Sequence, residues 1–284
     1  MLKQRVITAI VLLLVLLPAL FHADPLWWRL ATLALIAAGG WEWGRLNGLG
    51  PFGAWGSGFA ALLACVMAWD LGLIQRPLSA LWMGGGAIWV LLGAALLKAG
   101  VPAWPKLPRV LRLLGGLAAL WLTWLAVVQA HALGVAFLLS VLTLVWMADI
   151  AAYFAGHAWG GRVMPGKLAP SVSPGKSWEG VWGGMAGVLL LAVIWVALER
   201  AGVLPAPSLY GHLQARGGWL LLALGALFLA AMSVVGDLVE SLVKRSAGVK
   251  DSSGLLPGHG GVLDRVDALL PTLPLAMMLY SISA

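Results

Sequence analysis

Acids, a hydroxyl and bases recur at helical spacing in residues 236–245, near the carboxyl end of the chain. In a helix, Asp237, Ser241 and Lys244 stand at i, i+4 and i+7, so their side chains share one face. Glu240 lies beside them at i+3. A carboxylate inside a membrane-spanning helix costs at least ~2.5–3.5 kcal/mol at mid-bilayer on insertion scales, and it is a functional candidate by default.

A second polar stretch, residues 256–267, holds a Pro-Gly-His-Gly-Gly turn and then the start of another helix. Asp264 and Asp267 stand at i and i+3, again on one face. Three carboxylates on two neighbouring helix ends, near Lys and Arg, suggest a divalent cation with phosphate, because Mg²⁺ takes carboxylate, phosphate and water oxygens. The glycines would let backbone N–H groups approach an anion. The alternative, a set of internal salt bridges, does not explain why His259 and four glycines converge here.

A third polar region begins with Asp149 and Tyr153, which are one helical turn apart. The loop 156–178 follows them. Its residues 175–177, Gly-Lys-Ser, resemble the end of a phosphate-binding P-loop, but the position of the leading glycine holds Pro170 and no strand precedes it. The serines, lysine and flexible backbone still suit phosphate. The alternative is an ordinary loop whose charges set membrane orientation.

The composition shows what must position these groups. Of 284 residues, 61% are hydrophobic and 10% charged, whereas soluble chains are about 45–50% apolar and about 25% charged. A single cysteine excludes a disulfide scaffold. Continuous apolar blocks such as residues 6–20 and 220–235 exclude the alternation of a transmembrane β-barrel. The net charge of +7 is scattered between apolar blocks, which argues against nucleic acid.

We therefore predict an all-α, polytopic integral membrane protein with about nine transmembrane helices. We assign residues 1–130 to scaffold helices and residues 131–284 to a catalytic region with cytoplasmic loops 156–178 and 244–261. A tight turn is expected at residues 129–131, and overlapping small-xxx-small pairs at Gly180–Gly187 predict close helix packing. The predicted spans are 6–22, 26–43, 52–70, 78–97, 110–129, 131–155, 179–198, 218–242 and 262–281.

The charge distribution predicts the orientation. With the N-terminus in the cytoplasm and nine alternating spans, the cytoplasmic side receives all but four of the 18 Lys and Arg residues. This asymmetry follows the positive-inside rule. We expect a multi-pass protein of the cell inner (plasma) membrane, with both polar loops in the cytoplasm. The four exceptions are Arg29, Arg76, Arg200 and Arg216.

The whole run from Ser241 to Asp267 resembles the signature of the phosphatidate cytidylyltransferase (CDP-diacylglycerol synthase) family. The loop 167–180 is also similar to that family, as is Asp149 with residues 152–154. The fixed elements of the main signature are Ser241, Lys244, Arg245, Lys250, Asp251, Pro257, His259, Gly260, Gly261, Asp264, Arg265 and Asp267.

This resemblance implies a nucleotidyltransferase of phospholipid biosynthesis that converts CTP and phosphatidate into CDP-diacylglycerol and pyrophosphate. It implies Mg²⁺ held by Asp237 and Asp264, with Asp267 as a further ligand or a partner of one, and a second cation such as K⁺. It also suggests a homodimer. The implied catalytic residues are Ser241, Lys244, Arg245, Asp264, Arg265 and Asp267. The implied contacts to CTP and its phosphates are Ser173, Lys176, Ser177, Lys250, His259, Gly260 and Gly261.

Two alternatives stay open. One is another CTP-using membrane enzyme, such as a polyprenol kinase or a CDP-archaeol synthase, for which weaker agreement across the signature is expected. The other is a transporter or channel with broken helices around buried charges. Inverted repeats in both halves would indicate a transporter, whereas this chain gathers its charges in the second half.

Overall fold

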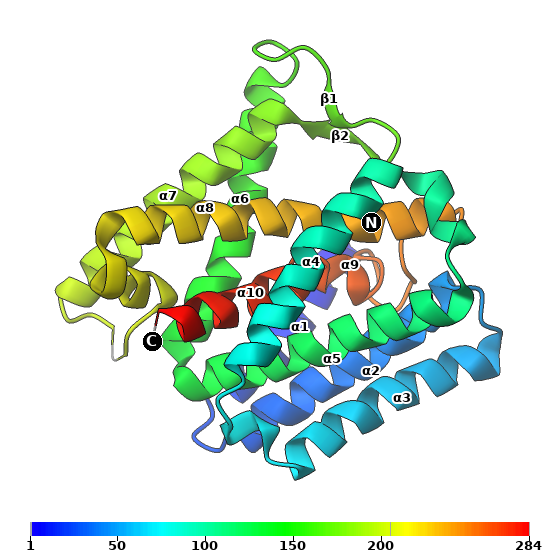
Figure 1. The fold of residues 1–284 in the computed structure, drawn as a ribbon, viewed down its shortest axis with the longest axis horizontal. Coiled ribbons are helices and arrows are strands. Elements are labelled where there is room, and N and C mark those ends of the chain that lie inside the picture. The colour runs from blue at the N-terminus through cyan, green and yellow to red at the C-terminus, as the bar shows by residue number, and fades with distance from the viewer. Residues whose placement is uncertain (1, 205, 284) are drawn as a thin grey trace.

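The fold is a bundle of long helices, seen in a computed structural model that describes residues 2–204 and 206–283 (Figure 1). The first half contains α1 (Leu2–Phe21), α2 (Leu26–Leu46), α3 (Pro51–Asp70), η1 (Leu73–Gln75), α4 (Ser79–Ala99), η2 (Val101–Lys106) and α5 (Arg109–Leu133). The second half contains α6 (Val135–Trp159), β1 (Lys167–Ala169), β2 (Ser173–Ser177), α7 (Trp178–Arg200), α8 (Leu209–Ser246), α9 (Leu263–Val266) and α10 (Leu269–Ile282).

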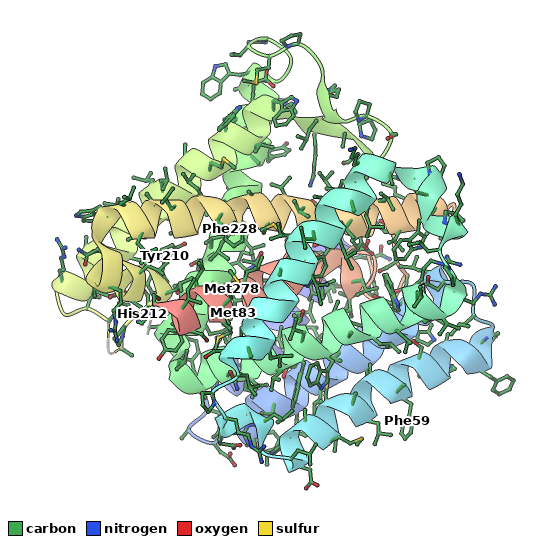
Figure 2. The ribbon with its side chains drawn as sticks, viewed as in Figure 1. Phe59, Met83, Tyr210, His212, Phe228 and Met278 are labelled. Carbon is green, nitrogen blue, oxygen red and sulfur yellow. The ribbon has the colours of Figure 1, made fainter. Side chains whose placement is uncertain are left out.

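Seven helices within the described residues are long and apolar enough to cross a membrane, namely α1 and α3 to α8. The prediction of an all-helical, polytopic membrane protein is therefore confirmed. Large apolar side chains point outward from these helices, as Phe59 of α3 does with 65% of its surface exposed (Figure 2). The count of nine stays a prediction, because α2 carries Arg29, Glu42 and Arg45 and α10 has only 14 residues.

One end of the bundle collects the start of α1, the η2 connection, the end of α8 and the loop before α9. Arg5 Nε donates a hydrogen bond to the carbonyl oxygen of Gly258 (2.9 Å). Ser246 Oγ donates to the carbonyl oxygen of Val101 (3.2 Å). Thr8 Oγ1 of α1 donates to the carbonyl oxygen of Pro257 (2.9 Å), so the first turns of α1 lie against the loop before α9.

The opposite end joins the carboxyl ends of α1 and α5 and the start of α8. His131 Nε2 lies 3.0 Å from the carbonyl oxygen of Leu20. His212 Nε2 lies 3.0 Å from Ser283 Oγ, and Figure 2 places His212 beside the last turn of α10. The two termini of the described chain therefore lie at different ends of the bundle.

The contact between α6 and α7 relies on small residues, as the sequence predicted. A Cβ added at Gly183 would overlap the Cβ of Ala155, and one added at Gly184 would lie 2.8 Å from the carbonyl oxygen of Ala148. The absence of side chains lets the two backbones approach closely. This pair carries the hairpin of β1 and β2, whose antiparallel register pairs Lys167 with Ser177.

Three local predictions need correction. The turn between the fifth and sixth helices lies at Gly134 (φ +137°) rather than at residues 129–131, because a backbone with positive φ favours glycine. The loop predicted over residues 156–178 contains the β1–β2 hairpin. The eighth helix begins at Leu209 instead of residue 218, and a break at residues 217–218 separates its first turns from the long apolar segment.

Candidate active site

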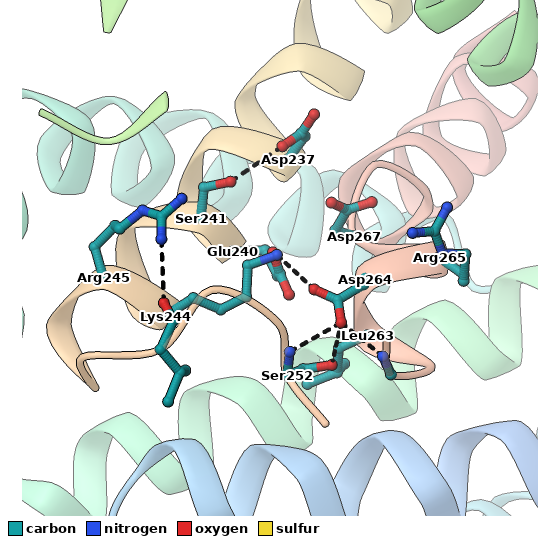
Figure 3. A network of polar contacts seen from close by, with 12 residues as sticks. Asp237, Glu240, Ser241, Lys244, Arg245, Ser252, Leu263, Asp264, Arg265 and Asp267 are labelled. Atoms are coloured by element: carbon teal, nitrogen blue, oxygen red, sulfur yellow. Dashed lines mark hydrogen bonds and ion pairs between the residues drawn. The ribbon is translucent and has the colours of Figure 1, made fainter. Parts of the chain in front are cut away.

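The two carboxyl-terminal polar stretches meet because α8 packs against the junction of α9 and α10 backbone to backbone. A Cβ added at Gly236 would lie 2.5 Å from the carbonyl oxygen of Asp267 and 2.8 Å from the ring of Pro271. Glycine permits this close approach because it has no side chain. The next residue of α8 is Asp237, and Figure 3 shows its carboxylate and that of Asp267 near this contact, with no hydrogen bond drawn between them.

The polar face of α8 is the predicted one. Ser241 Oγ donates a hydrogen bond to Oδ1 of Asp237 (3.3 Å), which confirms that the two share a face. Lys244 Nζ lies 2.5 Å from Oε2 of Glu240 and 2.5 Å from Oδ1 of Asp264 (Figure 3). Lys244 therefore joins α8 to α9, with two carboxylates around one ammonium group.

Asp264 is held by several donors at once. Its Oδ2 accepts hydrogen bonds from Gly261 N–H (2.7 Å), Ser252 N–H (2.9 Å) and Ser252 Oγ (2.8 Å). Burial opposes the charge of this carboxyl group, but Lys244 and the backbone N–H groups outweigh burial and lower the pKa of Asp264. The aspartate is therefore ionised at neutral pH and fixed in direction.

The β1–β2 hairpin brings a second lysine to the same face of α8. Lys176 Nζ lies 2.5 Å from Oδ2 of Asp237, and both side chains are partly buried. Ser177 is buried and its Oγ accepts the N–H of Gly180 (3.2 Å), so it caps the start of α7. Ser173 begins β2 and is half-buried. Of the three predicted hairpin residues, Lys176 contacts the carboxylates directly.

Two arginines from the signature remain largely exposed. Arg245 Nε donates to the carbonyl oxygen of Val172 (3.3 Å), which ties α8 to the hairpin. Arg265 Nε donates to the carbonyl oxygen of His259 (3.0 Å). Lys250 is exposed in the loop between α8 and α9. Figure 3 shows Arg245 and Arg265 on either side of the carboxylates, and each guanidinium group has N–H groups without a hydrogen-bond partner among the described residues, as phosphate binding would need.

The predicted glycine-rich turn is tight. His259 N–H donates to the carbonyl oxygen of Leu256 (2.8 Å), and Leu256 N–H donates to that of Gly260 (2.8 Å). Gly258 and Gly260 have φ values of +76° and +85°, which favour glycine. His259 Nδ1 is buried without a hydrogen-bond partner among the described residues. The N–H of Gly261 is donated within the protein, to Asp264, so it is not free for an anion.

A cavity of about 460 Å³ lies beside this network, between α6, the hairpin, α7 and α8. Asp149, Tyr153 and Lys176 supply polar lining, while Leu168 and Val234 supply apolar lining. Asp149 and Tyr153 thus face one space, as their spacing predicted. Because Lys176 borders the cavity and contacts α8, the cavity adjoins the charged network.

Carboxylates suited to a cation were predicted at Asp237, Asp264 and Asp267. No group of three Asp, Glu, His or Cys side chains within residues 2–204 and 206–283 has a metal-binding arrangement. The oxygens of Asp264 are engaged as described above. Asp267 accepts one hydrogen bond, from Ala268 N–H to Oδ1 (2.8 Å), and its Oδ2 has no hydrogen-bond partner in the described part. The oxygen donors of Asp237 and Asp267 are those that Mg²⁺ prefers.

Sequence reasoning missed one residue that touches this network. Glu42 of α2 is fully buried. Its carboxylate accepts hydrogen bonds from Ser253, Val262 and Leu263 and lies 3.2 Å from the Ser252 hydroxyl. The signal was present, since an acid in an apolar helix is a functional candidate. It was overlooked because its hydrogen-bond partners lie more than 200 residues away in the sequence.

Glu179 is a second carboxylate that shapes the region. Its Oε1 accepts the N–H groups of Gly161 (3.0 Å), Val163 (3.1 Å) and Met164 (2.9 Å). It thereby folds the segment before β1 against the start of α7. Acidic residues are frequent in the first turn of a helix, so the sequence signal for this contact was weak.

This geometry defines a class: a membrane enzyme whose lysines, arginines and carboxylates can bind phosphate groups beside a partly apolar cavity. The chain matches the Cytidylyltransferase family over residues 3–283 and belongs to that family. It is therefore a nucleotidyltransferase, as the resemblance of the signature implied.

The chain is similar to proteins named phosphatidate cytidylyltransferase. It is 41% identical to the one from Pseudomonas aeruginosa, an alignment covering 96% of this chain and 95% of that protein. It is 37% identical to the one from Haemophilus influenzae, with 99% of each covered. The one from Bacillus subtilis is 38% identical over 52% of this chain and 49% of that protein. The family resemblance predicted from residues 241–267 is confirmed.

Proposed function

We propose that this protein transfers the cytidylyl group of CTP to phosphatidate, giving CDP-diacylglycerol and pyrophosphate. The membership of the family and the near full-length relatives support this reaction. The structural observation that carries it is the network of Lys176, Asp237, Lys244 and Asp264 beside a partly apolar cavity among membrane helices. Such a site suits a charged nucleotide and a lipid phosphate together.

The reaction needs no nucleophilic side chain. A phosphate oxygen of phosphatidate, already an oxyanion, forms a bond to the α-phosphorus of CTP. The bond from that phosphorus to the oxygen of the β-phosphate breaks, and its electron pair leaves with pyrophosphate. The task of the protein is to align the two phosphates and to neutralise their charge.

We assign the cationic side chains of α8 and α9 to the phosphates. Lys244, Arg245 and Arg265 steady the phosphates, and Ser241 donates a hydrogen bond to one of them. Lys250 extends the basic rim on the loop. Arginine suits phosphate because its planar fork donates two parallel hydrogen bonds.

The hairpin and the glycine-rich turn hold the nucleotide. We assign Ser173, Lys176 and Ser177 to CTP, since Lys176 lies between the cavity and α8. In the turn, His259 has a buried nitrogen without a partner in the described structure. The predicted contact of Gly260 with the phosphates stays part of this proposal, whereas Gly261 already donates its N–H to Asp264.

Mg²⁺ would be held by Asp237 and Asp264, with Asp267 as a further ligand or a partner of one. When bound, the ion neutralises charge on the transferring phosphates. The free oxygen of Asp267 supports its assignment. Asp264 would be a ligand whose Oδ1 is paired with Lys244 in this structure. A second cation such as K⁺ is assigned to this site by the family resemblance alone.

The site faces the cytoplasm, in the cell inner membrane. The start of α1, the η2 connection and the loop before α9 share one end of the bundle. That end carries most of the Lys and Arg residues, as expected for a cytoplasmic end. With the N-terminus on the same side, α2 and α10 complete nine spans. Following the resemblance, the enzyme forms a homodimer.

One assay tests this function. Purified protein is incubated with labelled CTP, Mg²⁺ and phosphatidate, and the products are separated. We expect a CDP-lipid and pyrophosphate in equal amounts, and neither when phosphatidate is omitted. Product formation with a polyprenol instead of phosphatidate, or no product under any of these conditions, would contradict the proposal.

A further inference from the structure

Glu42 is a buried acid that the reaction described above does not use. It lies in the last turns of α2, between Trp41 and Trp43, and its surface is 0% exposed. No Lys, Arg or His lies within ion-pair distance of it among the described residues. A buried carboxylate without a cation is costly unless hydrogen bonds stabilise its charge.

The stabilising donors come from the loop between α8 and α9 and from Leu263, the first residue of α9. Oε1 of Glu42 accepts Val262 N–H (2.9 Å) and Ser253 Oγ (2.5 Å). Oε2 accepts Leu263 N–H (2.7 Å) and lies 3.2 Å from Ser252 Oγ. A helix of the first half of the chain thus binds the loop that carries the signature.

The same loop segment also binds Asp264. Gly261 donates its N–H to Asp264, and the next two residues, 262–263, donate theirs to Glu42. The Ser252 hydroxyl lies between the two carboxylates, 2.8 Å from Asp264 Oδ2 and 3.2 Å from Glu42 Oε2. Movement of Glu42 would therefore move the donors that orient Asp264.

Gly261 shows how closely the two parts fit. A Cβ added there would overlap both Ser252 Oγ and Glu42 Oε1. Glycine is required at this position so that the carboxylate of Glu42 can reach the backbone. One glycine of the signature is thereby explained by contact with α2.

We infer that Glu42 is a positioning residue for cytidylyl transfer. From α2 it fixes the backbone of residues 261–263, and through that backbone and Ser252 it sets the direction of the Asp264 carboxylate toward Lys244. Glu42 itself touches no substrate. The kinetic part of the test rests on the proposed function, whereas the structural part does not.

Two substitutions separate this role from simple packing. Glu42→Gln keeps the volume but replaces one acceptor with an NH₂ donor that faces backbone N–H groups. Glu42→Asp keeps the charge and both acceptors but is one methylene shorter. If Glu42 acts by accepting hydrogen bonds, Glu42→Asp retains more activity than Glu42→Gln. If it only fills space, the order reverses and the inference is overturned.

The first measurement is the Mg²⁺ concentration that gives half-maximal rate, because this value does not depend on the fraction of active protein. We expect Glu42→Gln to raise it about tenfold, the effect typical of removing a group that orients a metal ligand. Ser253→Ala, which removes a single donor to Glu42, should shift it less and in the same direction. This milder variant keeps the test valid if Glu42→Gln does not fold.

The second measurement is hydrogen exchange of the loop amides in the purified protein. In Glu42→Gln, the amides of Val262 and Leu263 should exchange faster than in the wild type. The matched control is Glu199→Gln, because Glu199 accepts Ser208 N–H (2.9 Å) and joins α7 to α8 at the opposite end. The control should change neither the Mg²⁺ concentration at half-maximal rate nor the amide exchange of residues 262–263.

Unchanged exchange at residues 262–263 and an unchanged Mg²⁺ requirement in Glu42→Gln would overturn the inference. A wild-type protein that forms no CDP-lipid would contradict the proposed function instead. The exchange measurement would still decide whether Glu42 anchors the loop, so the two failures are distinguishable.

Discussion

Two lysines of the site each neutralise an aspartate on a neighbouring element. Lys176 pairs with Asp237, and Lys244 pairs with Asp264. A nucleotide phosphate competes for the lysines, while a cation competes for the aspartates. In the proposed function, a Mg²⁺–CTP complex brings both charges together, so it can compete for both pairs at once.

The first prediction concerns Asp264. Asp264→Asn should lower kcat/KM for CTP at least about 100-fold, because it removes charge from the carboxylate that orients Lys244 and joins the cation site. Initial rates across a Mg²⁺ titration provide the measurement. Asp70→Asn, an exposed position at the end of α3, is the matched control and should behave as wild type. Near-normal rates for Asp264→Asn would refute its role.

The second prediction concerns Lys176. Lys176→Ala should raise KM for CTP at least about tenfold and KM for phosphatidate much less, since a charge-assisted contact is worth about 1.5–3 kcal/mol. Both values come from initial rates with the other substrate saturating. Equal increases for the two substrates would argue that Lys176 serves only to hold Asp237.

Single residues differ in how well the sequence predicted them. The sequence singles out Asp237 and Asp264 because acids, bases and glycines cluster around them in the chain. It does not single out Glu42, because the partner Leu263 lies 221 residues away and no local pattern reports such a contact. The capping role of Ser177 depends on where α7 begins, which sequence places only within a few residues.

Among the elements, the α6–α7 pair positions the hairpin that carries Lys176. The two helices pack closely because α7 has glycines at the contact, with Ala155 of α6 opposite Gly183. Since the hairpin has only two short strands, a shift of these helices would move Lys176 away from Asp237.

The third prediction tests this contact. Gly183→Leu should destabilise the protein by about 1–3 kcal/mol, because the new side chain overlaps Ala155 of α6. The midpoint of thermal unfolding in detergent provides the measurement. Gly56→Leu on α3 is the matched control, since no atom lies within 4 Å of a Cβ at that position. Equal midpoints for the two variants would contradict the close packing.

The sequence predicted the long helices well because each is a continuous apolar block of spanning length. The sequence did not predict the turns and strands that depend on backbone conformation or on strand pairing. The turn at Gly134 depends on a positive φ, and the strands around Ser173 depend on pairing with residues 167–169. The start of α8 at Leu209 was missed because a break at residues 217–218 separates it from the apolar block.

At the scale of the whole molecule, the bundle has two distinct ends, and both the charge distribution and the contacts distinguish them. Arg5 contacts the signature loop at Gly258, so the start of the chain and the site share an end. His212 and Ser283 meet at the other end. This arrangement supports alternating spans and a cytoplasmic site.

The fourth prediction tests the orientation. In a Cys65→Ala background, Ser171→Cys and Leu255→Cys should react with a membrane-impermeant thiol reagent only from the cytoplasmic side. Val203→Cys should react only from the opposite side. All three positions are exposed, whereas Cys65 is fully buried. Labelling of the first two from outside would refute the proposed topology.

The hydrogen bonds from residues 262–263 to Glu42 have a consequence for biosynthesis. A ribosome makes α2 early, and the N–H groups that satisfy Glu42 emerge only after another 221 residues. Until then, the nascent chain carries an acid in its second helix without its final donors. In the proposed topology, the last turns of α2 lie near the cytoplasmic surface, where water can solvate that acid before its donors are made. Insertion of the final loop therefore completes the first helices as well as the site.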